Sequence, residues 1–383
     1  MATPKLRFNE FNEKWEEKKL GKICQHFKSG KSITSKYITD TGDYPVYGGN
    51  GLRGFTTNFT HDGKFILIGR QGALCGNVQL ASGKNYISEH AIAVQADQKN
   101  STDWLAYWLD NMKLNRFSES SAQPGLAVNK LIKFKIKLPT KAEQTKVATF
   151  LSAVDTKIDE LIQKHELLSE YKKGMMQQLF SQKLRFKADD GSDFEDWDDI
   201  TLGEISSKSL AKNKDESISE VLTNSATQGV IKQSDYFERD IVTTSNLKGY
   251  YVVEIGDFVY NPRISSQAPV GPIKRNKQCL GVMSPLYTVF TTNKGDINYL
   301  EYFFESSIWH DYVKSVSNSG ARHDRMNIKN QDFFDMPILY PCLAEQTKIA
   351  NFLTAIDQKI DNVAEQIDHA KTWKKGLLQQ MFV

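Results

Sequence analysis

The chain has 383 residues, of which 40% are hydrophobic and 11% aromatic, and its formal net charge is +3. This composition is that of an ordinary globular protein rather than a disordered one, and the length allows two domains or a repeat. The longest strongly apolar run, from Phe65 to Ile68, is far shorter than the roughly 20 residues that cross a bilayer. The sequence lacks a signal-peptide pattern and its four cysteines are scattered, so we expect a cytoplasmic protein with reduced thiols.

Charge is unevenly distributed along the chain. Residues 1–141 hold 21 Lys and Arg against 12 Asp and Glu, a net of +9, whereas residues 183–341 hold 18 against 23, a net of −5. Much of the acidic excess lies in residues 189–199, which we interpret as a solvated linker. A basic first block suits the phosphate backbone of a nucleic acid, although an ordinary solvated surface would explain the charge equally well.

Residues 1–141 are expected to form a mixed, strand-rich domain. Residues 64–68 predict a short buried strand, the glycine clusters at 48–51 and 69–72 predict turns, and residues 103–114 predict a short helix. Polar, Gly-rich loops between strands suit the reading of base edges, because Arg pairs bidentately with guanine and Asn or Gln with adenine. For any single residue, a solvated loop side chain is the alternative. The candidate DNA-binding residues of this block are Tyr47, Asn50, Arg53, Arg70, Gln71, Lys84 and His90.

Residues 142–182 are expected to form one long helix, since they contain no proline. Apolar residues recur at spacings of three and four from Val147 to Leu179, which predicts a narrow apolar stripe that packs on a second helix. We interpret His165, which lies on this stripe, as a tolerated polar group rather than a ligand. Lys172 also interrupts the stripe, so the last turns are expected to pack differently.

Residues 183–341 are expected to form a second strand-rich domain, about twenty residues longer than the first block. Residues 256–260 predict a turn into a strand, and the spacing of apolar residues from Tyr299 to Val313 predicts a helix. A second long helix is expected over residues 342–383. The candidate DNA-binding residues of this block are Asn224, Arg263, Gln267, Lys274, Arg275, Arg322, His323 and Arg325.

The two expected helices are copies of each other. Ala142-Glu143-Gln144-Thr145-Lys146 recurs after 202 residues at Ala344 to Lys348, and 19 of the 40 pairs aligned without a gap are identical. A weaker repeat precedes each block, where Lys5 to Phe8 matches Lys183 to Phe186. The chain therefore consists of a leading segment, a globular block and a helix, followed by the same again. The helices should pack together, and an antiparallel pair would give a pseudo-twofold with the blocks at opposite ends.

Motifs of catalysis are absent from the sequence. Gly30-Lys31-Ser32 resembles the end of a phosphate loop, but position 25, which should be glycine, is Gln25. His165-Glu166 begins like a zinc-protease helix, yet the second histidine would fall on Ser169. No Asn/Asp-Pro-Pro-aromatic tetrapeptide and no G-x-G-x-x-G opening a helix occur. We therefore expect a chain that is not itself an enzyme and that binds no metal or cofactor.

The whole chain resembles the specificity subunit, called HsdS, of type I restriction-modification systems. The resemblance rests on the doubled Ala-Glu-Gln-x-Lys start, on the Asp-x-Lys-Ile-Asp of each helix, and on the Lys-Lys-Gly-x-x-Gln-Gln-x-Phe close. The first block's Tyr47-Gly48-Gly49-Asn50-Gly51 and Ile68 to Ala73 resemble one type of target-recognition domain. The second block's Val259-Tyr260-Asn261, Ser284 to Tyr287 and Gly320-Ala321-Arg322 resemble another.

The resemblance implies an α+β fold with two target-recognition domains, 1–141 and 183–341, and two spacer helices, 142–182 and 342–383. It also implies that each domain reads one half of a split, asymmetric site in double-stranded DNA, and that the helix pair sets the gap. Two adenine-N6 methyltransferase subunits and the restriction subunits would then be the partners, and these would carry S-adenosylmethionine, ATP and magnesium. Candidate docking residues for the methyltransferases are Phe150, Met175, Met176, Phe352, Leu377 and Leu378, which could instead thicken the helix-pair core.

Two other hypotheses remain open at this point. The chain could be a self-sufficient regulator that binds DNA through two domains on a rigid spacer. It could also be a structural adaptor whose blocks bind protein. DNA binding with and without a methyltransferase partner distinguishes the three hypotheses.

Overall fold

The computed structural model describes residues 4–118, 125–236, 247–318 and 324–382, and the chain divides into two compact units. Unit 1 contains residues 1–163 and 363–383, and unit 2 contains residues 164–362. Each unit combines one globular block with part of both long helices, α3 (Lys141–Phe180) and α9 (Leu343–Met381). The two helices expected from the repeat are thus present, within a few residues of the expected bounds. Positions 142 and 342 mark where helices begin, whereas the compact units divide both helices near their middle.

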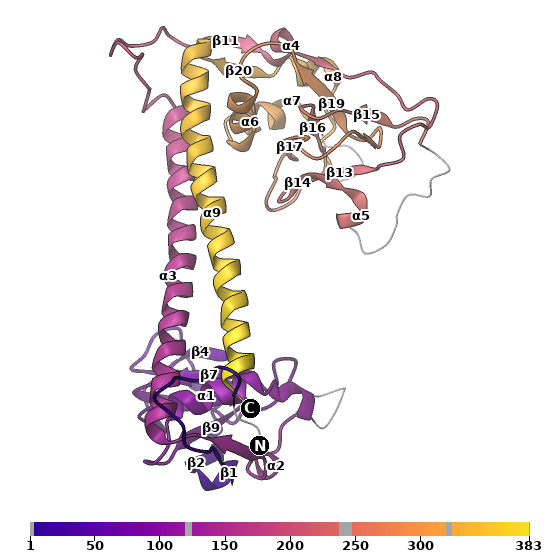
Figure 1. Ribbon diagram of the computed structural model, residues 1–383. Helices are drawn as coiled ribbons and strands as arrows, with labels where there is room; N and C mark the ends of the chain where they lie inside the picture. Colours follow the sequence, from indigo (N-terminus) through magenta and orange to yellow (C-terminus); the bar gives the residue numbers. More distant parts are fainter. Residues whose placement is uncertain (1–3, 119–124, 237–246, 319–323, 383) are drawn as a thin grey trace. The chain divides into compact units, whose positions relative to one another are not determined.

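Unit 1 has two four-stranded sheets and a two-stranded ribbon (Figure 1). The first sheet has the order β2 (Cys24–Ser29), β9 (Ala91–Ala96), β6 (Phe65–Gly69), β7 (Val78–Ala81). The second has the order β4 (Gly51–Thr56), β3 (Tyr44–Gly48), β8 (Lys84–Ile87), β5 (His61–Asp62). The ribbon pairs β1 (Glu16–Lys19) with β10 (Lys135–Leu138). The helices and 3-10 turns are α1 (Thr102–Asn111), α2 (Val128–Leu131), η1 (Leu20–Lys22), η2 (Ser35–Tyr37) and η3 (Leu114–Phe117).

The core of unit 1 follows from its apolar strands and from α1. β6 is entirely buried, as a central strand with an unbroken apolar run should be. Ser101 begins α1, because its hydroxyl accepts the Trp104 backbone N–H at 3.3 Å. α1 then buries Trp104 and Leu105 against this sheet and α3.

Two histidines meet where the two sheets of unit 1 approach each other. The rings of His26 on β2 and His61 on β5 lie edge to face with centroids 5.2 Å apart, and both contact Phe65. The Thr60 hydroxyl bonds Nδ1 of His61 at 2.8 Å, whereas Nε2 of His26 is buried without a hydrogen-bond partner in the described structure. Burial, with the neighbouring His26 and Lys31, lowers the pKa of His61 to about 4. Burial likewise lowers the pKa of His26. Both rings are therefore neutral in the folded unit near pH 7.

Unit 2 repeats one sheet of unit 1 and replaces the other. The sheet β12 (Ser206–Lys208), β19 (Thr288–Thr292), β16 (Phe258–Tyr260), β17 (Ile273–Arg275) has the same antiparallel order as β2-β9-β6-β7. β11 (Asp198–Thr201) pairs with β20 (Pro337–Tyr340) as β1 pairs with β10. Two separate pairs, β13 (Leu222–Ser225) with β14 (Gly229–Lys232) and β15 (Tyr251–Val253) with β18 (Gly281–Met283), stand in place of the second sheet. Its helices are α4 (Leu202–Ile205), α5 (Gln233–Tyr236), α6 (Ile297–Glu305), α7 (His310–Val316) and α8 (Asn330–Phe334).

The helix predicted over residues 299–313 is two helices, so that prediction was wrong. α6 begins at the Asp296 cap, whose carboxylate accepts the N–H groups of Asn298 and Tyr299. It ends at Ser306, whose hydroxyl donates to the Phe303 carbonyl at 2.6 Å. Apolar spacing carried the prediction across this break because Ile308 fits the period, yet Ile308 is 40% exposed.

Within each unit the parts of α3 and α9 run antiparallel and are joined by the same three residue types. In unit 1 Asp155 on α3 forms an ion pair with Lys374 on α9 and accepts the Tyr107 hydroxyl at 2.7 Å. In unit 2 the aspartate and the lysine 202 positions away do the same, with a tyrosine of α6. There Asp357 pairs with Lys172 at 2.7 Å and accepts the Tyr302 hydroxyl at 2.7 Å. We call these the Lys–Asp–Tyr braces.

The braces explain why a lysine interrupts each apolar stripe. Each lysine also lies over the ring of its tyrosine, and each tyrosine belongs to a helix of a globular block, α1 or α6. Lys172 has a further partner in Glu305 at 2.8 Å. Burial lowers the pKa of Lys172, but Glu305 and Asp357 outweigh it, so that the pKa is raised and the lysine stays charged. The brace therefore ties both long helices to the domain of the same unit.

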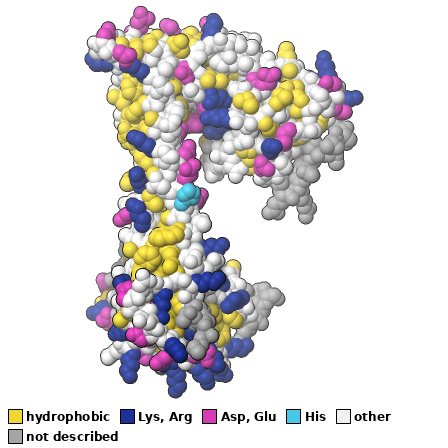
Figure 2. Space-filling model, in the orientation of Figure 1, with side chains coloured by type: hydrophobic (Ala, Val, Ile, Leu, Met, Phe, Trp, Pro, Cys, Tyr) yellow, Lys and Arg dark blue, Asp and Glu magenta, His cyan; other side chains and the backbone are white. Residues whose placement is uncertain are grey.

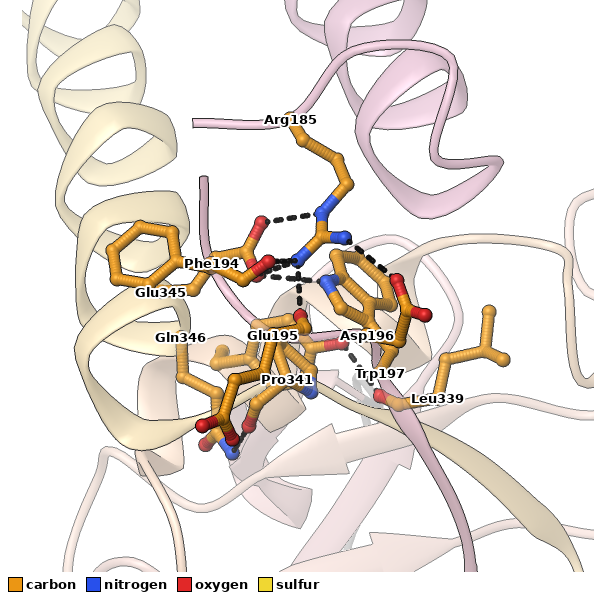
Figure 3. A network of polar contacts seen from close by, with 10 residues as sticks. Arg185, Phe194, Glu195, Asp196, Trp197, Leu339, Pro341, Glu345 and Gln346 are labelled. Carbon is orange, nitrogen blue, oxygen red and sulfur yellow. Dashed lines mark hydrogen bonds and ion pairs between the residues drawn. The ribbon is translucent and has the colours of Figure 1, made fainter. Parts of the chain in front are cut away.

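The repeated Ala-Glu-Gln start of each helix fastens the leading segment. In unit 2 the Arg185 guanidinium donates to both oxygens of Glu345, at 3.2 and 2.8 Å, and Trp197 Nε1 donates at 2.8 Å (Figure 3). In unit 1 Arg7 donates to both oxygens of Glu143 at 2.7 Å, with Trp15 at 3.4 Å. We call these the Glu–Arg–Trp clusters.

The glutamate of each cluster is buried, and the neighbouring glutamine closes the helix start. The side chain of Glu345 is 0% exposed and that of Glu143 is 1% exposed. Gln346 Nε2 donates to the Pro341 carbonyl at 2.7 Å, and Gln144 does the same to Pro139 at 2.9 Å. The two adjacent polar residues of the repeated start thus bind the leading segment and the residue before the helix in each unit.

The acidic linker over residues 189–199 is exposed in its side chains but fastened through its backbone. The Asp189, Asp193 and Asp196 side chains are solvated, as the charge run indicated. Arg185 donates to the carbonyls of Phe194 and Glu195 at 3.3 and 2.5 Å (Figure 3).

Among the described residues, no helix combines the length and apolar character needed to cross a membrane.

Candidate nucleic-acid interface

Three loops of unit 1 meet at one place. The hairpin between β3 and β4, the loop after β6 and the segment after β8 are joined by backbone contacts, of which the Arg70 N–H to the His90 carbonyl is 2.9 Å. Gly49 lies against this junction, where a Cβ would fall 2.8 Å from the His90 carbonyl and 3.3 Å from the Gly69 Cα. Gly51 has a φ of +102°, which favours glycine at the turn. The glycines singled out in the sequence therefore allow the loops to approach.

This junction, which we call the unit 1 loop surface, carries six of the seven candidates of the first block. Asn50, Arg53, Gln71 and His90 are exposed, and Tyr47 and Arg70 are partly exposed. Neither Arg53 nor Arg70 forms an ion pair within the described residues, so both guanidinium groups are available. Lys84 lies at the far end of β8, with its ammonium 4.9 Å from the centre of the Phe59 ring.

Unit 1 carries many basic side chains on its surface (Figure 2). Lys and Arg side chains are spread over the visible face of its globular part, in the lower part of the view (Figure 2). This distribution agrees with the excess of nine positive charges in residues 1–141. A surface with free guanidinium and amide groups among basic side chains can hold a phosphate backbone and contact base edges.

The candidates of unit 2 are divided between surface and interior. Residues 262–264 pair with 324–326, which brings Arg263 and Arg325 opposite each other across an antiparallel bridge. Arg263 and Gln267 are exposed, and Lys274 is partly exposed on β17. Nε of Arg325 is buried without a hydrogen-bond partner in the described structure. Arg322 and His323 lie outside the described residues.

Two predicted contacts of unit 2 hold the domain together instead. Asn224 is 2% exposed, and its amide donates to the carbonyls of Val259 and Pro272 at 2.7 and 3.2 Å. Arg275 forms an ion pair with Glu301 at 2.8 Å, and both side chains are largely buried. Neither side chain is presented to a ligand, because both are largely buried and their donor groups bind partners inside the domain. Polarity in the sequence could not distinguish these residues from solvated loop residues.

The predicted docking residues divide in the same way. Met176, Leu377 and Leu378 are at most 8% exposed and belong to the unit cores, as the alternative interpretation held. Met175 is partly exposed. Phe150 and Phe352 are also partly exposed, and each packs edge to face on a phenylalanine of the leading segment, Phe8 or Phe186.

An exposed aromatic residue occupies the same position of both helices. Trp373 on α9 is 54% exposed and lies edge to face on Phe150, with centroids 6.0 Å apart. Its equivalent 202 positions earlier, Tyr171 on α3, is 51% exposed. The sequence analysis missed this pair because it followed the apolar stripe, although aromatic residues at matching positions of the repeat could have revealed it. We call Trp373 and Tyr171 the paired exposed aromatics.

Each of the two domains has its own sheet of the same strand order, but their surface loops differ. Each domain is followed in the chain by one long helix. This arrangement defines a duplicated scaffold. The chain belongs to the type I restriction modification DNA specificity domain family, which matches residues 12–168 and 194–371. Each match contains one recognition domain and most of the helix that follows. The resemblance seen in the repeat is thereby confirmed.

Individual relatives agree with this assignment. The specificity subunit of the EcoprrI type I restriction enzyme from Escherichia coli is 41% identical over 155 residues, which are 39% of this chain and 38% of that relative. The chain thus matches well under half the length of this relative. The MjaVIII specificity subunit from Methanocaldococcus jannaschii is 25% identical over 396 residues, covering 96% of this chain and 92% of the relative.

A solved structure supports the fold over the whole length. The S subunit of a type I restriction-modification system from M. genitalium has a TM-score of 0.63 at 16% identity, covering 100% of this chain and 99% of that one. The α+β architecture with two strand-rich domains and paired helices, expected from the repeat, is therefore confirmed.

Proposed function

We propose that the chain is the DNA-reading subunit of a type I restriction-modification complex, in which each unit contacts one half of a split site. The observation that carries this proposal is the unit 1 loop surface, where four exposed polar side chains converge from three loops on a unit with many basic side chains. Unit 2 shares the underlying sheet but has different strands and loops above it. The two half-sites should therefore differ in sequence.

In this proposal the loops recognise the bases, and the braced helices support the domains. Lysines contact the phosphate backbone of the DNA and fix each unit on the duplex, while Arg53, Arg70, Asn50 and Gln71 contact base edges. Methyl transfer from S-adenosylmethionine and ATP-driven, magnesium-dependent cleavage belong to partner subunits. An adenine inside a duplex must be flipped out for methylation, so the bound DNA is expected to be distorted.

The experiment begins with methylation-sensitive sequencing of DNA from cells that carry the intact system, which gives the site. Fluorescence anisotropy then measures binding by the chain alone and with its methyltransferase. Arg70→Ala should weaken the cognate site by roughly 10- to 100-fold and relax one half-site only, since a bidentate base contact contributes about 1–3 kcal/mol. Lys84→Ala is the matched control, because it removes a charge from the same domain away from the loop surface. It should weaken all sequences about equally.

Three outcomes separate the hypotheses. Selective binding that requires the methyltransferase supports the specificity subunit. Full selectivity of the chain alone supports the self-sufficient regulator. Absence of binding under both conditions leaves the protein-binding adaptor, and equal effects of Arg70→Ala on both half-sites would refute the assignment of one half-site to unit 1.

We further propose that two copies of one methyltransferase dock at the paired exposed aromatics, one on each unit. Equivalent surfaces on the two halves of a repeat suit two identical partners, and exposed Trp and Tyr are typical interface anchors. Trp373→Ser and Tyr171→Ser should each remove one partner, and the double variant both, as measured by native mass spectrometry. Leu343→Ser is the control, since Leu343 is 61% exposed at the start of α9 and is distant along the helix from Trp373. Unchanged stoichiometry in the double variant would refute this docking site.

A further inference from the structure

A pocket of about 580 Å³ opens in unit 2 between the end of α3 and the connection from α6 to α7. α3 contributes residues from Ser169 to Phe180, the following link contributes Ser181 and Lys183, and the connection contributes Glu305 to Ile308. The volume lies within the range of about 300–1,000 Å³ that is usual for small-molecule sites. None of the functions discussed above uses this pocket.

The floor and one wall of the pocket are apolar. Phe180 is 1% exposed and Met176 is 7% exposed, and both belong to the core of unit 2. Ile308 is 40% exposed at the rim, in the connection where the predicted single helix is broken. Ile308 follows the apolar spacing of the helix but lines an open pocket, so part of its side chain has no apolar contact within the domain. The pocket can therefore cover the flat or apolar part of a ligand.

Two lysines without ion-pair partners among the described residues give the pocket rim positive charge. Lys172 forms ion pairs with Glu305 and Asp357, at 2.8 and 2.7 Å, so this lysine is not available to a ligand, and the three groups together carry one negative charge. Lys173 and Lys183 also line the pocket, are exposed, and form no ion pair within the described residues. The remaining charge thus favours an anion at the rim.

The polar groups of the rim are not all available to an anion. The hydroxyls of Ser181 and Ser306 donate to backbone carbonyls of their own segments, and that of Ser306 also accepts the Ile308 N–H, so neither is a donor for a ligand. Gln177 also lines the pocket and is exposed, so its amide can bind a ligand oxygen. An apolar floor below two unpaired ammonium groups and the Gln177 amide is the arrangement that binds a small organic anion.

We propose that this pocket of unit 2 binds a small organic anion with an apolar body, of which an aryl phosphate is the simplest representative. The apolar body covers Phe180 and Ile308, and the anionic group lies between Lys173 and Lys183. Such a ligand contacts both α3 and the α6–α7 connection, and therefore joins the helix to the recognition domain.

The probe is 1-naphthyl phosphate, titrated into the full chain by isothermal calorimetry. We expect saturable 1:1 binding, with at least about tenfold weaker binding of inorganic phosphate, which lacks the apolar body, and of 1-naphthol, which lacks the charge. Bound ligand should also raise the melting temperature, and the rise should continue with the logarithm of the ligand concentration above the Kd. If inorganic phosphate binds as tightly as the aryl ester, the site recognises the anion alone and the proposal is wrong.

Variants locate the binding. Lys173→Gln and Lys183→Gln should each weaken binding by roughly fivefold, the upper range for an exposed charge pair. Ile308→Asp should abolish it by placing a carboxylate at the rim, where it repels the anionic ligand. Lys375→Gln, which changes the equivalent of Lys173 in unit 1, is the matched control and should have no effect. Circular dichroism verifies the fold of each variant, and a well-folded Lys173→Gln/Lys183→Gln double variant with unchanged affinity would overturn the proposal.

Discussion

Removal of Arg185 tests whether the Glu–Arg–Trp cluster fastens unit 2. In Arg185→Met the fully buried carboxylate of Glu345 loses both guanidinium hydrogen bonds and keeps only the Trp197 N–H at 2.8 Å. Breaking a buried ion pair by removing one partner costs about 3–5 kcal/mol. Because the Arg185 side chain is 23% exposed, we expect a loss near the lower end, about 3 kcal/mol, in the free energy of unfolding.

A double-mutant cycle supplies the control. Glu345→Met in the Arg185→Met background removes the uncompensated buried charge and should restore most of the lost stability, leaving a coupling of about 2 kcal/mol or more. Arg7→Met tests the same contact in unit 1, where the carboxylate of Glu143 is equally buried, and should cost a similar amount. Urea unfolding followed by circular dichroism measures each variant. A loss below about 1 kcal/mol for Arg185→Met, or additive single losses in the cycle, would refute the reasoning.

Three further predictions concern both units. The folded-state pKa of His61, about 4, lies below its unfolded value, so the neutral form is favoured by folding. The contribution of His61 to the stability of unit 1 should therefore be fully present above pH 6.5 and be lost as the pH drops from 6.5 to about 4. Melting curves recorded across this range should show the loss, and His61→Phe should make the loss smaller. Lys172→Met should destabilise more than Lys374→Met in thermal unfolding, by about 1 kcal/mol, because Lys172 has a second carboxylate partner in Glu305; equal losses would contradict the role of that partner. Asn224→Ala should lower the free energy of unfolding by about 2 kcal/mol while leaving the DNA site selected by the folded complex unchanged, and an altered site would show that Asn224 does contact bases.

The repeat made the architecture predictable. Identical residues at a fixed shift of 202 required two equivalent helices, and the apolar spacing gave their bounds within a few residues. The same repeat contained the glutamates of the Glu–Arg–Trp clusters and the lysines and aspartates of the braces, but the sequence alone could not show their partners. Glu143 and its arginine lie 136 residues apart, and no local pattern indicates that this carboxylate is buried.

The loop junction was predictable only in unit 1, where glycines occupy positions that a residue with a Cβ would not tolerate. Gly49 and Gly51 mark a loop junction, and the side chains beside them are exposed together in unit 1. In unit 2 no such marker separates Arg263, which is exposed, from Arg275, which is paired with Glu301. Whether an arginine is free depends on the carboxylates that tertiary folding brings to it, and these come from distant parts of the chain.

The braces also determine what a recombination error in the gene would produce. An unequal exchange between the two identical Ala-Glu-Gln-Thr-Lys stretches would join Gln144 to Thr347 and delete one domain together with one helix. The shortened product keeps Asp357 and Lys374 on a single helix but loses the partner of each, Lys172 and Asp155. Two copies of that product could satisfy all four charges, since Asp357 of each would meet Lys374 of the other beside a Tyr107. A gene of about half the length would then encode a symmetric dimer with two identical domains.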